Sequence, residues 1–109
     1  MQLNVSDLMG MFEQFQNKLE ELKSKLASLV IEGEAGGGMV KAAMNGNFQL
    51  VQLDIDPSLL SPENKKMLED LVIAAVNITQ QKTAEAVQKM SEDQFGFLGP
   101  LRSMLPPLA

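Results

Sequence analysis

Large apolar residues recur every three or four positions near the amino terminus, which is the spacing of one face of an amphipathic helix. Ser6 is a suitable N-cap, and Asp7 would interact favourably with the positive end of the helix dipole. The helix is expected to end near Leu29 and to be about 35 Å long at 1.5 Å per residue. Its apolar positions, in alternating steps of four and three, are Leu8, Phe12, Phe15, Leu19, Leu22, Leu26 and Leu29.

This stripe has the a/d heptad pattern of a helix-packing seam. It packs either on the sheet and second helix of its own chain or, in its distal part, on a helix of a partner. The partner alternative is favoured, because a helix of this length overhangs a three-stranded sheet.

Three short strands joined by glycine turns are predicted for residues 31–57. The three glycines at 36–38 reach the positive φ values that a tight reversal needs. Asn45 and Gly46 together predict a two-residue hairpin between the second and third strands. The three strands should therefore form an antiparallel meander.

The third strand places Val51, Leu53 and Ile55 on one face, whereas Leu50 has the opposite parity. The break in alternation fits either a β-bulge or burial on both faces of the sheet. Proline cannot donate to a strand ladder, so the strand is expected to end before Pro57.

A second long helix is predicted to begin at residues 61–63, where Ser61 is the N-cap, Pro62 the first helical residue and Glu63 an acid in the first turn. Its first half has a broad apolar stripe that should be buried. From Gln80 onward the helix is mostly polar, which suits a helix that projects into solvent or toward a ligand. The apolar positions are Leu68, Leu71, Val72, Ala75, Val76, Ile78 and Thr79, continued by Ala86, Val87 and Met90.

These elements predict a single α+β domain over residues 1–94. Residues 95–109 contain two Gly, three Pro and several large apolar residues, which exclude a continued helix. This tail is expected to be flexible, to dock on the core or to bind a partner. The chain has no Trp, no Tyr and only five Phe, so one copy has a thin core. A homodimer is therefore expected.

The absence of Cys and His excludes disulfides, thiol nucleophiles, imidazole bases and the usual zinc ligands. The glycine-rich segment lacks the GKS or GKT ending of a phosphate-binding loop. Asp54 and Asp56 share a strand face and could hold a cation, but a solvated turn is the favoured interpretation. We predict no catalytic, cofactor or metal site and do not expect an enzyme.

No signal peptide and no apolar segment of the roughly 20 residues that span a bilayer is seen, so a cytoplasmic protein without membrane contact is expected.

The formal net charge of −5 disfavours a purely electrostatic nucleic-acid binder, because phosphate neutralisation drives such binding. Seven of the nine basic residues lie on the predicted helices, so if duplex DNA is bound, the helices should bind it. The candidate DNA-binding residues are Lys18, Lys23, Lys25, Gln80, Gln81, Lys82 and Lys89. The alternative is ordinary helix-surface solubility. Pairs four residues apart, Glu21 with Lys25 and Glu85 with Lys89, favour that alternative.

Four segments together resemble the YbaB/EbfC family of nucleoid-associated proteins over about residues 8–94. They are the amphipathic first helix rich in Gln, Glu and Lys, then VIEGEAGGGMVKAAMNG, QLDIDPSLL and KKMLEDLVIAAVNITQQKTAE, in that order without large insertions. The resemblance implies a bacterial-type homodimer whose helices project like the arms of tweezers. It also implies that the dimer binds duplex DNA, affects nucleoid organisation and transcription, and has no catalytic site.

The sequence departs from this family where many relatives have basic residues. After Asn77, the chain continues with Ile78, Thr79, Gln80 and Gln81 before the first lysine. The single arginine of the chain, Arg102, lies in the tail. The alternative function is therefore a protein-interaction module of the same fold, with weak or no DNA binding, that recruits a partner through the heptad seam or the tail.

Overall fold

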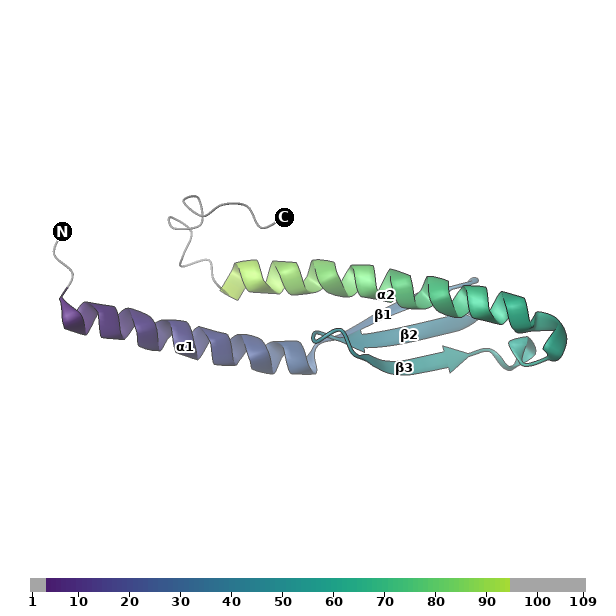
Figure 1. Ribbon diagram of the computed structural model, residues 1–109, viewed down its shortest axis with the longest axis horizontal. Helices are drawn as coiled ribbons and strands as arrows, with labels where there is room; N and C mark the ends of the chain where they lie inside the picture. The colour runs from purple at the N-terminus through teal and green to yellow at the C-terminus, as the bar shows by residue number, and fades with distance from the viewer. Residues whose placement is uncertain (1–3, 95–109) are drawn as a thin grey trace.

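A computed structural model describes residues 4–94 as a long helix, a three-stranded sheet and a second long helix (Figure 1). The elements are α1 (Val5–Ser28), β1 (Val30–Ala35), β2 (Val40–Asn45), β3 (Leu50–Ile55), two short 3-10 turns, η1 (Pro57–Leu59) and η2 (Pro62–Asn64), and α2 (Lys65–Gln94). The α+β order predicted from the sequence is confirmed. The molecule is elongated, with extents of 72 × 25 × 16 Å.

Helix α1 begins earlier than the sequence predicts. Its N-cap is Asn4, whose side-chain oxygen accepts a hydrogen bond from the backbone N–H of Asp7 at 2.8 Å. The prediction of Ser6 as the cap is wrong, because Asn is an equally good cap and its use adds helical residues to α1. The helix ends as expected, where the N–H of Leu29 donates to the carbonyl of Lys25 at 2.9 Å.

The sheet is antiparallel with strand order β1-β2-β3, as the meander prediction requires. At the first reversal, Gly36 and Gly37 have φ of 65° and Gly38 has φ of 91°. Each value lies in the left-handed region, where a side chain would be strained. The prediction of a glycine turn is confirmed here.

The second reversal is not the two-residue hairpin predicted from Asn45 and Gly46. The N–H of Asn45 donates to the carbonyl of Gln49 at 3.0 Å, which leaves three residues in the loop, and the positive φ of 62° belongs to Phe48. Gly46 serves a different purpose. Its N–H donates to the carbonyl of Leu26 at 2.9 Å, and an added Cβ would lie 2.6 Å from that oxygen. A glycine is therefore needed so that the loop can contact the end of α1.

A β-bulge accounts for the break in alternation on β3. Met44 pairs with Leu50 and Ala43 with Gln52, so Val51 is the extra residue. Burial on both faces is not the cause within one chain, because Leu50 and Val51 are 46% and 54% exposed there.

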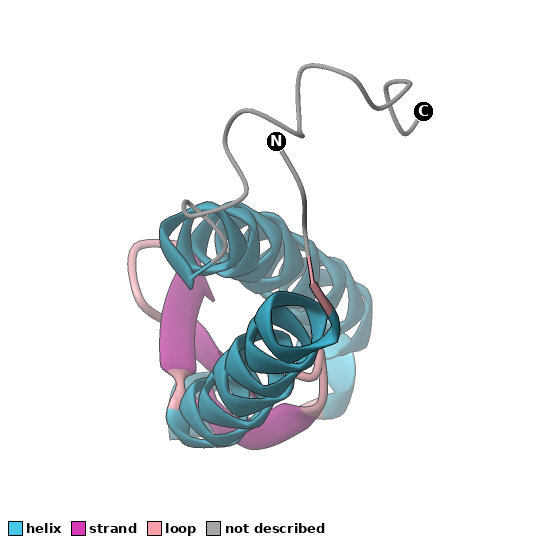
Figure 2. Cartoon of the chain, turned by 90° about the vertical axis from the view of Figure 1, so that its left-hand side faces the viewer, coloured by secondary structure: helices cyan, strands magenta, loops and turns pink. Residues whose placement is uncertain are grey.

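Helix α2 covers one face of the sheet over β1 and β2, and Figure 2 shows it lying to one side of the strands. The buried cluster between them consists of Val40, Ala42, Leu59 and Ala75. Ile78, included in the predicted stripe, is 40% exposed because it lies about 100° round the helix from Thr79.

Thr79 and Thr83 are both fully buried, and each hydroxyl donates to the carbonyl one turn earlier at 2.7 Å. The first half of α2 is thus packed as expected, and the packing extends beyond Gln80.

The connection into α2 contains two residues at helix-cap positions, Asp56 and Ser61, and only the side chain of Asp56 makes a capping hydrogen bond. The Asp56 carboxylate accepts a hydrogen bond from the N–H of Ser58 at 2.9 Å, and this bond lowers the pKa of Asp56. Asp56 is therefore a cap of η1, in agreement with the turn interpretation. Ser61 precedes Pro62 as predicted, but its side chain makes no capping bond, and regular α-helix begins only at Lys65.

Candidate nucleic-acid interface

The two helices extend beyond the same end of the sheet (Figure 1), and we call α1 and residues 80–94 of α2 the arms. Helix α1 leaves the sheet and has no buried residue along its whole length. Helix α2 runs back over the sheet in the opposite direction and ends beside the C-terminal half of α1, at Glu21 and Lys25. The arms therefore overlap only in part, and residues 5–17 of α1 extend past the end of α2.

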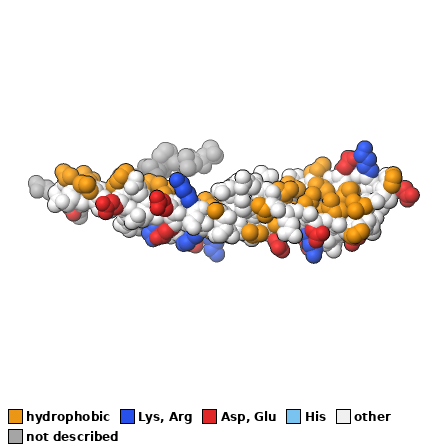
Figure 3. Space-filling view, turned by 90° about the horizontal axis from the view of Figure 1, so that it is seen from below, with side chains coloured by type: hydrophobic (Ala, Val, Ile, Leu, Met, Phe, Trp, Pro, Cys, Tyr) orange, Lys and Arg blue, Asp and Glu red, His pale blue; other side chains and the backbone are white. Residues whose placement is uncertain are grey.

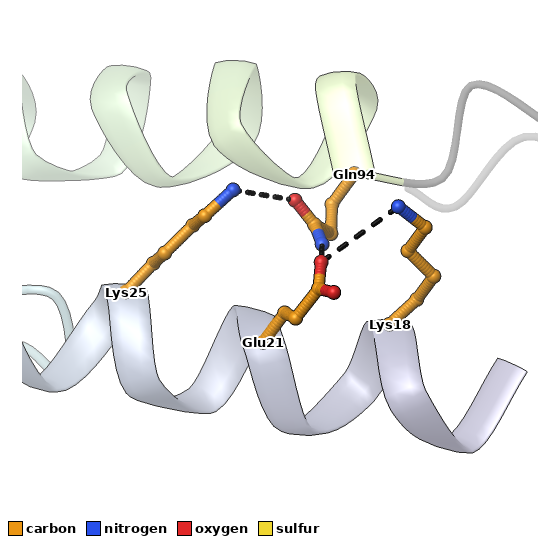
Figure 4. A network of polar contacts seen from close by, with 4 residues as sticks. All are labelled: Lys18, Glu21, Lys25 and Gln94. Carbon is orange, nitrogen blue, oxygen red and sulfur yellow. Dashed lines mark hydrogen bonds and ion pairs between the residues drawn. The ribbon is translucent and has the colours of Figure 1, made fainter. Parts of the chain in front are cut away.

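A polar cluster joins the two arms where they overlap (Figure 4). Gln94, at the end of α2, is only 7% exposed. Its side-chain oxygen accepts a hydrogen bond from Lys25 Nζ at 2.9 Å, and its Nε2 donates to the Glu21 carboxylate. Lys18 Nζ lies 3.7 Å from the same carboxylate. We call these four residues the arm clasp.

The clasp changes the expected roles of two candidate lysines. Lys25 was expected to pair with Glu21, but it instead donates to Gln94, and Glu21 pairs with Lys18. The reason is that the side chain of Gln94 projects from the end of α2 and lies between the side chains of Glu21 and Lys25, as Figure 4 shows. Both lysines would have to be released, wholly or in part, before they could contact a phosphate.

The other candidates are more accessible. Lys82 Nζ lies 3.5 Å from the carbonyl of Glu32 on β1 and is otherwise exposed. Lys23 and Lys89 are exposed and make no hydrogen bond or ion pair with another residue in the part of the chain that the structure describes. The expected pair between Glu85 and Lys89 is not formed among these residues.

The candidates on α2 lie on different faces of the helix. Lys82 and Lys89 are seven residues apart, which places them on one face, directed toward the β1 side of the molecule. Gln80 and Gln81 are both exposed but point about 100° and 200° round the helix from the buried Thr79. The structure therefore brings the two lysines together and separates them from the glutamines.

The electrostatic character of the arms is weak. Helix α1 carries three lysines and four acidic residues, and residues 80–94 carry two lysines and three acidic residues. Each arm thus has one net negative charge, so only local groups of lysines offer positive potential. No arginine is present in either arm for bidentate phosphate contacts.

Sequence reasoning did not identify Gln94, and it assigned Glu21 only to an ion pair with Lys25. Gln94 ends a polar helical segment, and its partners lie 69 and 73 positions away in the chain. Helical periodicity reports only contacts within one helix, so it cannot find such a pair. The only feature that pointed to this contact was the predicted length of the second helix, whose end would have to lie near the first helix.

Exposed apolar side chains gather in two places, on the N-terminal part of α1 and at the sheet end of the molecule (Figure 3). At the sheet end, Leu50, Val51 and Leu53 of β3 and Ile73 of α2 are between 41% and 58% exposed. Patches of this kind on a small protein indicate contact surfaces.

Two further properties concern residues 4–94. No helix in this range is both long and apolar enough to span a membrane. Within the same residues, His, Cys, Asp and Glu nowhere form a group of three that could hold a metal ion.

Comparisons with known proteins agree with this architecture. The sequence model of the YbaB/EbfC DNA-binding family matches residues 1–97. The chain is 38% identical over 87 residues to a nucleoid-associated protein of Anaeromyxobacter dehalogenans, covering 80% of this chain and 84% of that protein. It is 36% identical over 104 residues to a nucleoid-associated protein of Agrobacterium fabrum, covering 94% of this chain and 97% of the relative.

The fold also matches a crystal structure. An uncharacterized protein from Helicobacter pylori superposes with a TM-score of 0.74 at 26% identity, covering 86% of this chain and 99% of that one. The names of the two relatives describe association with the nucleoid and not a catalysed reaction.

Proposed function

Because the chain belongs to the YbaB/EbfC DNA-binding family, we propose that it binds duplex DNA as a homodimer through its arms and so affects nucleoid organisation and gene expression. The observation that supports this proposal best is the grouping of lysines on the arms. All five candidate lysines lie on α1 or on the second half of α2, and three of them lie near the overlap of the two helices.

Lys82 and Lys89 are the lysines best suited to phosphate contact. They share one exposed face, and neither is held by a carboxylate of the described chain. Lys23 adds a further exposed ammonium on the opposite arm. Lysine acts on phosphate as a point charge and reads no bases, so binding should have little sequence preference.

The weak charge of the arms predicts modest affinity with strong salt dependence. In a dimer, Lys82 and Lys89 of both subunits would neutralise four phosphates. Log affinity falls by about 0.9 for each neutralised phosphate per decade of salt, so affinity should drop roughly 100-fold between about 50 and 200 mM salt. Hydrogen bonds from Gln80 and Gln81 would change this dependence little, because they release no counterions.

A titration of labelled duplex DNA of mixed sequence, followed by fluorescence anisotropy at these two salt concentrations, tests the proposal. The informative variant is K82E/K89E, which reverses the charge of the shared face and should abolish binding. The matched control is K65E/K66E at the opposite end of α2, where both lysines pair with acidic residues of the same helix. The control has the same net charge as the variant and should keep most of the wild-type affinity.

The outcomes separate the possible functions. Equal loss of affinity in both variants would show that only net charge matters and that the α2 face is not the binding surface. If the wild type fails to bind DNA even at the lower salt concentration, the DNA-binding proposal is wrong. The function would then be sought in protein recruitment by the same fold, which the negative arms and exposed apolar surfaces would suit.

A further inference from the structure

The N-terminal part of α1 presents an apolar surface that no described part of the chain covers. Val5, Leu8, Met9 and Phe12 are 71%, 53%, 61% and 61% exposed. Together with Glu13 and Gln16 they line an open hollow on the helix. Figure 3 shows hydrophobic side chains gathered at the end of the molecule away from the sheet. We call Val5, Leu8, Met9 and Phe12 the distal surface.

The distal surface is unsuited to DNA. Residues 5–17 contain no lysine or arginine, and their charged residues are Asp7 and Glu13. A negatively charged apolar surface repels phosphate, so it is not an extension of the lysine-bearing region. Exposing four large apolar side chains to water also costs roughly 25 cal/mol for each Å² of apolar area, so an apolar occupant would be stabilising.

The C-terminal residues of the same chain begin close to this surface. Gln94 is held by Glu21 and Lys25, so the segment that follows it begins beside the C-terminal half of α1. At that point α2 runs toward the amino-terminal end of α1 (Figure 1). The distance along α1 from Glu21 to Val5 is about 24 Å, whereas fifteen residues can span up to about 50 Å. Residues 95–109 are therefore long enough to follow the entire distal surface.

The composition of residues 95–109 is complementary to the distal surface. Their only charged side chain is Arg102, which is opposite in sign to Asp7 and Glu13. Three prolines favour an extended backbone that can lie along a helix. The large apolar side chains available for contact are Phe95, Phe97, Leu98, Leu101, Met104, Leu105 and Leu108.

We propose that residues 95–109 dock within their own chain on the distal surface of α1, with Arg102 near Asp7 and Glu13. The docked segment covers the apolar side chains of the distal surface, which stay exposed because α2 ends before it reaches them. It also prevents the distal part of the heptad seam from pairing with a helix of another copy. This inference does not depend on DNA binding.

Paramagnetic NMR on the full-length chain tests the proposal. The chain has no cysteine, so S103C gives a single site for a nitroxide label. The reporters are methionine methyl groups, with Met9 and Met11 on α1 and Met39 and Met67 at the far end of the sheet. Docking should broaden the Met9 and Met11 signals at least several-fold relative to those of Met39 and Met67. Unchanged intensities at Met9 and Met11 would overturn the proposal.

Two controls identify the occupant. The variant L8S/F12S should remove the broadening of Met11, whereas I73S, which alters an equally exposed residue at the sheet end, should leave it unchanged. A second sample is refolded from a mixture of nitroxide-labelled chains and separate isotope-labelled chains. Broadening in that sample would show that the segment docks on another copy, which contradicts the proposal; sharp signals there support docking within one chain.

Discussion

Two close approaches of backbone to backbone depend on single glycines, that of Gly46 to Leu26 and that of Gly33 to Thr79. Gly33 on β1 faces Thr79 of α2, and a Cβ at this position would lie 3.0 Å from the Thr79 nitrogen and 3.1 Å from its Cα. Thr79 is fully buried and its hydroxyl is bonded to the carbonyl of Ala75, so it cannot easily move. The contact of α2 with β1 therefore requires glycine at position 33.

The substitution G33A should destabilise the protein by about 1–3 kcal/mol, because the added methyl group pushes α2 away from the sheet. The matched control is G10A in α1, where an added Cβ meets nothing within 4 Å. That control should raise the free energy of unfolding by up to about 1 kcal/mol through helix propensity. Urea unfolding followed by circular dichroism measures both changes. Equal stability of G33A and the wild type would contradict the close-packing argument.

Single residues also show where prediction from the sequence failed. An Asn-Gly pair predicts a two-residue hairpin, yet the positive φ belongs to Phe48 and Gly46 makes the contact with Leu26. The local signal was overridden by a tertiary contact, which no short-range rule contains. The glycines at 36–38 behaved as predicted, because the reversal itself requires their positive φ values.

Among the elements, the two helices were predicted well and their mutual contact was not. Heptad and helical spacing depend on each helix alone, and they identified α1 and α2 with small errors at the ends. The arm clasp depends on how far each helix runs past the sheet. Consequently Lys18 and Lys25, two of the candidate DNA-binding residues, contact Glu21 and Gln94 in a way that the sequence did not predict.

The variant Q94A should loosen the last turns of α2. It removes both hydrogen bonds that attach α2 to Lys25 and Glu21, so local opening becomes easier while the core is untouched. We expect amide hydrogen exchange in residues 88–94 to speed up several-fold, with a change of about 1 kcal/mol or less in global stability.

The control for this experiment is Q88A, which truncates an exposed glutamine on the same helix. Exchange in Q88A should match that of the wild type. If Q94A also matches the wild type, the clasp does not hold the arms together.

At the scale of the whole molecule, one chain has a small apolar core. Among residues 4–94, six apolar residues are buried, and three of the six are alanines. A second copy packed on the apolar side of β3 would supply the missing burial, and this is the physical basis for the proposed homodimer.

The variant L53E tests this dimer. Leu53 of β3 is 41% exposed and lies on the same face of the sheet as α2, which covers β1 and β2. If a second copy buries this position, an unpaired carboxylate there would be costly. Sedimentation equilibrium should show that the wild type has twice the mass of L53E. The matched control is Q52E, which adds the same charge on the opposite face of β3 and should remain dimeric.

Circular dichroism has to show that L53E keeps its helices, so that loss of mass is not loss of fold. A monomeric, folded L53E should also bind DNA more weakly and with a shallower salt dependence, because each complex would neutralise half as many phosphates. A wild type that sediments as a monomer would exclude the homodimer. If L53E is still a dimer, the interface lies on another surface, and the arms would be the next surface to test.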